Sequence, residues 1–289
     1  MLEGKTHISI IIPVFNEEKI IANTLTKLTS YISKNRIPCE ILVCDDASSD
    51  STPQIVKKFK DQNVRCIRFS RRVGKGGTIR NCWRIAKGDV LVFIDADLPF
   101  DVDTIFKVAE LSYKTGKIVI GVRNVDSRKN QRPIRRFLSY VYNSLVRLMF
   151  KTGINDHQCG LKAIPRKYAL GPLQMIRTDG FLFDTELIVR AKINKIKIIP
   201  VGINWVDPRP RKSKIVPSRT ALTMLLDLIV VKLSTIFGRG VLKFRIVKRG
   251  HMKCLNDGTR YPVYGIEIDS NSNILKTARH IYIMMAFGG

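Results

Sequence analysis

Residues 90–97 read Val-Leu-Val-Phe-Ile-Asp-Ala-Asp, an unbroken apolar run that ends in two aspartates, Asp95 and Asp97. Continuous apolar runs of this length are typical of strands that are buried on both faces of a parallel sheet. Ligands bind at the carboxyl ends of such strands, and two carboxylates there suit Mg²⁺ or Mn²⁺ when a diphosphate supplies further oxygens. The alternative is a solvated turn in which an aspartate caps the next helix. It is less favoured because Asp101 is the better cap candidate.

Short β-rich runs alternate with helical patterns from the N-terminus to residue 205. This alternation predicts an α/β fold with a mostly parallel sheet that is flanked by helices. Apolar residues at helical spacing predict helices around residues 21–32 and 105–111. The predicted strands are Ile8–Val14, Glu40–Cys44, Val64–Ser70, Val90–Ile94, Lys117–Val122 and Ile196–Trp205.

Polar residues also follow the first three predicted strands. Residues 15–18 follow the first strand, Asp45 and Asp46 follow the second, and Gly74-Lys75-Gly76-Gly77 follows the third and opens a helix. This glycine cluster lacks the spacing of a dinucleotide fingerprint and of a P-loop. We expect its free backbone N–H groups, together with Lys75, to face a nucleotide phosphate or ribose. A purely structural turn is an equally good interpretation of the glycines.

The chain of 289 residues contains 50 Lys and Arg against 24 Asp and Glu, which leaves a formal net charge of +26. Such a surplus favours an anionic partner, either nucleic acid, a phosphorylated metabolite or anionic lipid. With 45% hydrophobic residues the composition is that of a folded globular chain. The six cysteines include no Cys-x-x-Cys pair and indicate neither a zinc ribbon nor a disulfide framework. We expect most of them to be reduced packing residues.

The pattern changes after residue 205. Prolines and basic residues over 207–214 predict a linker or an active-site flap. The apolar stretch 221–237 contains Asp227 and Lys232, which disfavour a membrane-spanning helix. Its amphipathic pattern predicts a helix that packs on the domain or lies in a membrane interface. Alternating runs at 241–248, 262–269 and 280–285, around the turn signal Asn256-Asp257-Gly258, predict a small β-rich appendage.

Six separated motifs resemble glycosyltransferase family two proteins of the GT-A fold, and within them the dolichyl-phosphate glucose and mannose synthases. The motifs are Ser9–Glu18, Val43–Ser48, Gly74–Gly77, Asp95–Asp97, Asp156–Lys162 and Phe183–Glu186. The Asp-x-x-Cys-Gly motif is closest to the glucosyltransferase branch. The resemblance implies a GT-A catalytic domain over residues 1–205 and a basic flap with a membrane-interface helix over 206–240. The role of a β-rich tail over 241–289 stays open.

The resemblance also implies roles for individual residues. The nucleotide would be bound by Pro13, Phe15, Glu17, Asp45, Asp46, Lys75 and Asp95. Asp95 and Asp97 would hold Mg²⁺ or Mn²⁺, although Pro99 stands where the mannose synthases have a glutamine that contacts the metal. The acceptor phosphate would contact Arg123, Arg135 and Ser139, and the candidate catalytic residues are Asp97, Asp184 and Lys214. Lys212 and Lys214 would close over the donor diphosphate or contact a membrane surface. Asp184 or Glu186 would orient hydroxyl groups or serve only the N-terminus of a helix.

A polar stripe runs along one predicted helix. Arg135, Ser139, Asn143, Arg147 and Lys151 recur every four residues, and apolar side chains occupy the other faces of this helix. A solvated outer face is the simple interpretation of such a stripe. The resemblance favours contact with the acceptor instead.

The predicted activity is inverting transfer of glucose or mannose from UDP-glucose or GDP-mannose to dolichyl or polyprenyl phosphate. A phosphate monoester is largely dianionic at neutral pH, so it can attack a sugar without a strong general base. We expect a peripheral protein without a spanning helix on an anionic membrane surface, at its cytoplasmic face, and no nucleic-acid partner. One rival is another family-two enzyme with a polysaccharide or glycolipid acceptor. The other is a basic nucleic-acid-binding protein, which would not explain aspartates at several strand ends.

Overall fold

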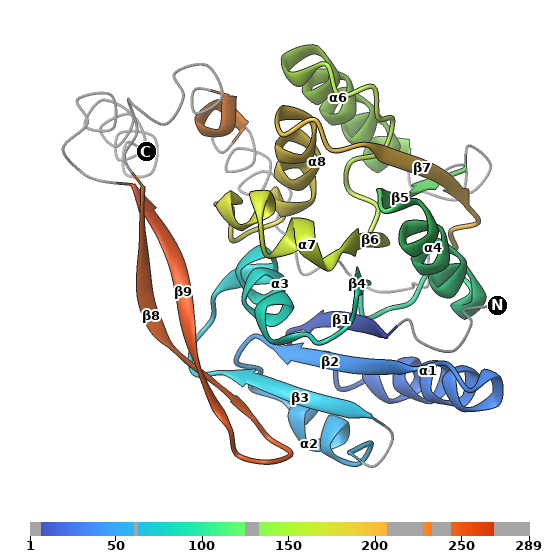
Figure 1. Ribbon diagram of the computed structural model, residues 1–289, viewed down its shortest axis with the longest axis vertical. Coiled ribbons are helices and arrows are strands. Elements are labelled where there is room, and N and C mark those ends of the chain that lie inside the picture. Colours follow the sequence, from blue (N-terminus) through green and yellow to red (C-terminus); the bar gives the residue numbers. More distant parts are fainter. Residues whose placement is uncertain (1–6, 61–62, 125–132, 207–227, 233–243, 269–289) are drawn as a thin grey trace.

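The computed structural model describes residues 7–60, 63–124, 133–206, 228–232 and 244–268. These residues form a nine-stranded sheet in the order β7-β5-β6-β4-β1-β2-β3-β8-β9, with helices on both faces (Figure 1). The strands are β1 Ile8–Val14, β2 Cys39–Asp45, β3 Val64–Phe69, β4 Val90–Phe93, β5 Ile118–Arg123, β6 Lys162–Pro165, β7 Ile198–Ile203, β8 Phe244–Cys254 and β9 Arg260–Ile268. The predicted fold class and the six strands predicted before residue 205 are confirmed.

The sheet is parallel over β1 to β4, and β5 is parallel to β7. The short strand β6 lies antiparallel between β4 and β5 and was not predicted. Its four residues begin with Lys162 and end with Pro165, so they carry no β-strand pattern. Because β6 runs in the opposite direction, its first residue lies at the edge where its two neighbouring strands end.

Each face of the sheet has its own helical layer and core, because successive strand residues point to opposite sides. Ile10 and Ile12 of β1 belong to the core under one layer, and Ile11 belongs to the other core. The first layer contains α1 Ile21–Asn35, α2 Thr52–Lys57 and α4 Val102–Thr115. The second contains α3 Gly74–Ile85, α7 Arg166–Ala169, the 3₁₀ turn η1 Pro172–Met175 and α8 Phe183–Ile193.

Helix α6, Pro133–Phe150, packs beside α8 through a third apolar cluster. Residues 228–232 are helical, and Leu228 and Val231 are buried in this cluster against Val146 and Val189. This part of the predicted amphipathic helix therefore packs on the domain, and its remaining residues lie outside the described ranges. None of the helices in the described part of the chain combines the length and apolarity that a bilayer crossing requires.

The predicted β-rich tail extends the central sheet. Strand β8 pairs antiparallel with β3 and forms a hairpin with β9 around the predicted turn (Figure 1). The Asn256 side chain continues the β3 ladder, accepting a hydrogen bond from the Cys66 N–H and donating to the Val64 carbonyl, both at 2.9 Å. The predicted run 280–285 lies outside the described residues. The division of the chain at residues 205 and 240 stays a prediction.

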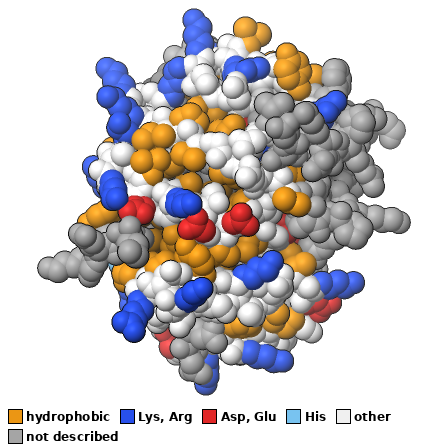
Figure 2. Space-filling view, turned by 90° about the vertical axis from the view of Figure 1, so that its right-hand side faces the viewer, with side chains coloured by type: hydrophobic (Ala, Val, Ile, Leu, Met, Phe, Trp, Pro, Cys, Tyr) orange, Lys and Arg blue, Asp and Glu red, His pale blue; other side chains and the backbone are white. Residues whose placement is uncertain are grey.

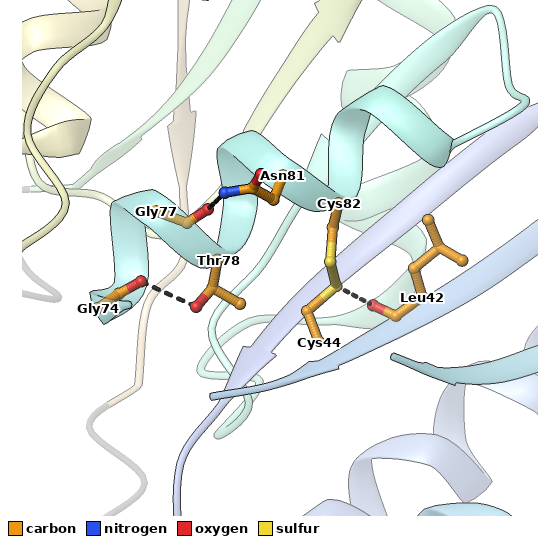
Figure 3. Close-up of a disulfide and its surroundings, with 7 residues drawn as sticks. All are labelled: Leu42, Cys44, Gly74, Gly77, Thr78, Asn81 and Cys82. Atoms are coloured by element: carbon orange, nitrogen blue, oxygen red, sulfur yellow. Dashed lines mark hydrogen bonds between the residues drawn. A yellow bond between two sulfur atoms is a disulfide. The ribbon is translucent and has the colours of Figure 1, made fainter. Parts of the chain in front are cut away.

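One pair of cysteines differs from the sequence-based expectation. Cys44 of β2 and Cys82 of α3 form a disulfide across 38 residues of sequence (Figure 3). A bond between positions so far apart leaves no local spacing pattern. The cysteines Cys39, Cys66, Cys159 and Cys254 are free and buried, as expected for most of the six. The disulfide attaches the glycine-rich helix α3 to the strand that ends in Asp45.

We expect Asn256→Ala to lower the free energy of unfolding by about 1 to 2 kcal/mol, because it removes two hydrogen bonds and leaves the buried Cys66 N–H without its partner. Chemical denaturation monitored by circular dichroism measures this change. The control is Asn35→Ala, which removes an exposed asparagine that bonds only within its own helix. Equal stabilities of the two variants would show that the two hydrogen bonds of Asn256 contribute little to the free energy of unfolding.

Candidate active site

The two aspartates follow β4 in a tight turn at the carboxyl edge of the sheet. Ile94 still bonds to β1, the Thr24 hydroxyl of α1 donates to the Ala96 carbonyl at 2.6 Å, and Leu98 has a left-handed φ of 43°. The turn is thereby held from two sides. The Asp95 side chain remains 38% exposed and Asp97 is half-buried, so both lie near the surface of this edge.

Gly160 packs directly against the Asp95 carboxylate. A Cβ atom built on Gly160 would lie 2.0 Å from Asp95 Oδ2, a separation that no side chain tolerates. Residue 160 must therefore be glycine if Asp95 is to keep this position. The glycine belongs to the Asp-x-x-Cys-Gly motif, which reaches the edge because β6 runs antiparallel to its neighbours.

A chain of alternating charges connects four of the predicted motifs. Lys75 Nζ lies 2.8 Å from Asp95 Oδ1 and 3.1 Å from Asp184 Oδ2. The other oxygen of Asp184 is 2.6 Å from Lys162 Nζ, and Lys162 also donates to the Cys159 carbonyl at 2.7 Å. The structure thus brings together Asp95, Lys75 and Asp184, three of the predicted site residues. The sequence patterns predict no role for Lys162 or Gly160, although both lie in a motif that carried the resemblance.

The buried members of this chain are stabilised as ions by one another. Burial alone would raise the pKa of Asp184, but Lys162 and Lys75 hold it below its ordinary value. Burial opposes the charge of Lys75, yet Asp184 and Asp95 raise its pKa well above the usual range. Both groups are therefore charged at neutral pH, as buried ions are when each has an opposite partner.

The expectation of free N–H groups in the glycine-rich turn is wrong. Asp46 accepts hydrogen bonds from the N–H groups of Val73 and Gly74, at 2.6 and 3.1 Å. The Asp179 carbonyl accepts from Gly76 and Gly77, at 2.8 and 3.3 Å. These N–H groups therefore stabilise the start of α3 through hydrogen bonds within the protein. Asp179, one of the two acceptor residues, lies in none of the predicted motifs. The backbone at Gly74 has a φ of +80°, which explains the glycine at this position.

Five of the predicted nucleotide-binding residues lie at the ends of β1 and β2, namely Pro13, Phe15, Glu17, Asp45 and Asp46. Asp45 is fully buried, burial raises its pKa, and its carboxylate accepts a hydrogen bond from the Ser48 N–H at 3.1 Å. The Arg72 guanidinium lies 3.5 Å above the Phe15 ring and 3.4 Å from Asp46. Pro13 and Glu17 are half-buried beside them along the chain.

Arg123 at the end of β5 forms a bidentate ion pair with the buried Asp156, at 2.7 and 2.8 Å. Its guanidinium also lies 5.6 Å from the centre of the Trp205 ring. The pair places this arginine against the same Asp-x-x-Cys-Gly loop that contacts Asp95. Beyond Trp205, the Val206 N–H donates to the Pro99 carbonyl, so Pro99 holds the chain immediately before the predicted flap. Lys212 and Lys214 lie outside the described residues.

The middle of the polar stripe of α6 is covered by the domain, since Asn143 is buried and Ser139 and Arg147 are half-buried. A solvated outer face is therefore wrong for the central residue of the stripe. Asn143 is buried and accepts hydrogen bonds from the backbone N–H and the Nδ1 of His157, and it donates to the Ser139 carbonyl at 2.8 Å. Burial lowers the pKa of His157 to about 4, so its ring is neutral at pH 7. Ser139 is half-buried on the same face, and Arg135 lies in the first turns of the helix.

Glu186 has a structural role. Its carboxylate accepts hydrogen bonds from the N–H groups of Arg177 and Thr178 at 2.9 Å and pairs with Arg190 at 3.0 Å. It therefore shapes the loop before α8 and lies at 0% exposure. Of the two carboxylates predicted at this helix, only Asp184 belongs to the charged chain that reaches Asp95.

The Asp95–Asp97 turn is the candidate site for the divalent cation that the sequence predicts. No group of three or more His, Cys, Asp or Glu side chains suited to a metal occurs among the described residues, so the candidate is a two-carboxylate site. Hard oxygens are the ligands that Mg²⁺ and Mn²⁺ prefer, and a diphosphate supplies more of them. The glycine at 160 leaves space for the Asp95 carboxylate that any side chain would fill.

Comparison with known proteins supports this picture. The family model for glycosyl transferase family 2 matches residues 9–170. The dolichyl-phosphate β-glucosyltransferase of Saccharomyces cerevisiae is 30% identical over 254 residues, which cover 80% of this chain and 75% of that protein. The human enzyme of the same name is 29% identical, with coverage of 80% and 76%. The glycosyltransferase AglD of Haloferax volcanii is 30% identical over 68% of this chain, which spans only 33% of that longer protein.

Solved structures show the same fold. Glucosyl-3-phosphoglycerate synthase from Mycobacterium tuberculosis superposes with a TM-score of 0.60 at 18% identity, covering 89% of this chain and 87% of that one. The predicted GT-A fold is thereby confirmed. Since the family model covers more than half of the chain and its strand-end motifs converge on one charged edge, the chain belongs to glycosyltransferase family 2.

Proposed function

We propose that this enzyme transfers glucose from UDP-glucose to dolichyl or a related polyprenyl phosphate, with inversion at the sugar carbon. The observation that carries the proposal is the charged chain Asp95–Lys75–Asp184, which joins three family motifs at the carboxyl edge of the sheet. The relatives named dolichyl-phosphate β-glucosyltransferases favour glucose over mannose. A β-linked product agrees with inversion of an α-linked donor.

Donor binding is assigned to the ends of β1, β2 and β4. The aromatic ring of Phe15 under Arg72 and the buried Asp45 suit a nucleobase and its ribose. Asp95 and Asp97 would hold Mg²⁺ or Mn²⁺, which would neutralise charge on the leaving diphosphate. Support comes from the M. tuberculosis synthase, whose structures contain Mn²⁺ with UDP-glucose and Mg²⁺ with UDP. Lys75 would add a fixed positive charge beside the diphosphate, and Lys214 would add a second from the flap.

The acceptor phosphate supplies its own nucleophile. One of its oxygens forms a bond to the sugar carbon while the bond from that carbon to the nucleotide diphosphate breaks, so no proton has to be removed first. The protein's task is to hold two anions in line. Arg123, Arg135 and Ser139 are the candidate acceptor contacts, and Asp184 holds Lys75 beside Asp95 on the donor side.

A lipid acceptor requires contact with a membrane, and the outer face of α6 suits this contact. Tyr140, Val141 and Leu148 lie on one side of this helix and are 65%, 46% and 78% exposed. Figure 2 shows hydrophobic and basic side chains next to one another at the upper end of the molecule, where α6 lies in Figure 1. Together with the net charge of +26, this suits the surface of an anionic bilayer. Nucleotide sugars are cytosolic, so we assign the cytoplasmic face.

Asp97→Asn should lower the rate of glucosyl transfer by at least about 100-fold while the fold is kept, because it removes one of the two carboxylates that would hold the cation that stabilises the leaving diphosphate. Product formation from UDP-glucose and a polyprenyl phosphate, detected by mass, measures the effect. Asp89→Asn, at the opposite edge of the sheet, is the control and should be as active as the wild type. Near-normal turnover of the Asp97 variant with Mn²⁺ or Mg²⁺ would remove the metal assignment.

Arg135→Ala should raise the KM for the lipid phosphate by roughly 10- to 100-fold, the loss expected for one charged hydrogen bond, and leave the KM for UDP-glucose unchanged. Steady-state kinetics with each substrate varied in turn measure both constants. The neighbouring exposed Arg136→Ala controls for the loss of one positive charge from α6. Equal losses toward donor and acceptor would contradict the acceptor role.

Leu148→Glu should reduce binding to anionic vesicles by about tenfold or more, because it removes an exposed leucine that would be buried in the lipid and adds a negative charge that the anionic lipid repels. Vesicle sedimentation measures the bound fraction, which should also fall at high salt. Tyr113→Glu, a similar change at an exposed position of α4, should bind like the wild type. If both variants sediment equally, α6 is not the membrane-contacting surface.

A further inference from the structure

The loop between α6 and β6 carries a buried imidazole that the proposed reaction does not use. His157 has 0% exposure, its Nδ1 lies 2.7 Å from Asn143 Oδ1, and its Nε2 lies 2.8 Å from Thr152 Oγ1. The Asn143 side chain in turn contacts Ser139, one turn earlier on α6. Thr152, His157, Asn143 and Ser139 thus form a hydrogen-bonded chain that ends at one of the candidate acceptor contacts.

A backbone group fixes the direction of every hydrogen bond in this chain. The His157 backbone N–H can only donate, and its partner 3.1 Å away is therefore the carbonyl oxygen Oδ1 of Asn143. Nδ1 of His157 faces the same oxygen, so Nδ1 must carry the hydrogen of the ring. Because burial lowers the pKa of His157 to about 4, the ring is neutral at pH 7. Nε2 consequently accepts a hydrogen bond from the Thr152 hydroxyl.

The fixed amide determines how Ser139 uses its hydroxyl group. With Oδ1 turned to His157, the NH2 group of Asn143 lies 2.8 Å from the Ser139 carbonyl and 3.3 Å from Ser139 Oγ. An amide NH2 group donates and does not accept, so Ser139 Oγ can only accept from Asn143. The hydroxyl hydrogen of Ser139 must therefore go to another acceptor. Ser139 is half-buried, so this acceptor can come from outside the helix.

An acceptor phosphate has a use for this hydrogen. A phosphate monoester is largely dianionic at neutral pH, and its oxygens accept hydrogen bonds. A serine hydroxyl can either donate or accept, and it attracts the phosphate only when it donates. A hydroxyl whose hydrogen is already directed away from Asn143 is preorganised for this contact, which lowers the cost of reorientation on binding.

We propose that His157 and Asn143 are positioning residues that present Ser139 as a hydrogen-bond donor to the acceptor phosphate. They act through the serine and do not touch the substrate themselves. The preceding residue, Asp156, fixes Arg123 by hydrogen bonds of 2.7 and 2.8 Å. Two consecutive loop residues therefore align two of the candidate acceptor contacts. The inference rests on the proposed function, since it assumes that Ser139 contacts the acceptor phosphate.

Two substitutions of His157 separate its donor from its bulk. In His157→Asn, the side-chain NH2 group stands near the position of Nδ1 and can still donate to Asn143. In His157→Gln, the longer side chain places its NH2 group near the position of Nε2 instead. Steady-state kinetics should show that His157→Gln raises the KM for the lipid phosphate by about 3- to 10-fold, the effect of one hydrogen bond, and leaves the KM for UDP-glucose unchanged. His157→Asn should stay within about twofold of the wild type.

A double-mutant cycle with Ser139→Ala shows whether the effect passes through the serine hydroxyl. In the Ser139→Ala background, His157→Gln should cause no further rise in the KM for the lipid phosphate. The control is Asn155→Ala, which breaks the 2.7 Å contact of the same loop with Arg147 and should leave both KM values unchanged. If His157→Gln fails to fold by circular dichroism, His157→Phe, which keeps a flat ring without nitrogen, takes its place in the cycle.

The outcomes distinguish the positioning role from the function on which it rests. The positioning role is overturned if His157→Asn and the folded Gln or Phe variant have equal KM values for the lipid phosphate. It is also overturned if the Gln or Phe variant has an undiminished effect in the Ser139→Ala background. A Ser139→Ala enzyme that uses the lipid phosphate like the wild type removes the acceptor contact assigned to Ser139, and the positioning role with it. A wild type that transfers no glucose to a polyprenyl phosphate refutes the proposed function instead.

Discussion

The position of one carboxylate, Asp95, constrains most of the active-site edge. It stands where the buried strand β4 ends, with one oxygen against Gly160 and the other paired with Lys75. A carboxylate that is partly withdrawn from water is tolerated only when opposite charge or hydrogen bonds compensate it. Lys75 provides this compensation, and Asp184 in turn compensates Lys75. The antiparallel strand β6 brings residue 160 to this edge of the sheet. Because residue 160 packs directly on the Asp95 carboxylate, it must be glycine.

The strands that carry the site were predictable because their burial leaves a strong local signal. Strand β4 is an unbroken apolar run, and the two aspartates after it mark the edge where ligands bind. The motif residues that meet there, Lys75 and Asp184 among them, were also identified in advance. The role of Lys162, which pairs with Asp184, was not identified, because it is a fully buried lysine in a strand too short to be recognised.

Long-range pairing decided what the sequence patterns missed. At the start of α3, the N–H groups of Gly76 and Gly77 donate to the backbone carbonyl of Asp179, and a carbonyl has no sequence signature. The burial of Asn143 on α6 likewise has no sequence signature. Asn143 is buried where it accepts hydrogen bonds from the ring and the backbone of His157, in the loop that follows α6. A four-residue polar period locates a helical face but does not reveal what covers it.

The loop before β6 connects the parts of the site that must act together. Gly160 contacts the donor-side Asp95, Asp156 fixes Arg123, and His157 holds Asn143 of α6. An acceptor bound at the proposed contacts, Arg123 and α6, would therefore be positioned by the same short segment as the carboxylate proposed for the donor side. This matters because two phosphorylated substrates repel one another, and an enzyme without a strong base depends on accurate placement for its rate. A misplacement of about 1 Å costs roughly 100-fold in rate, so one short loop that contacts both proposed sites would contribute directly to catalysis.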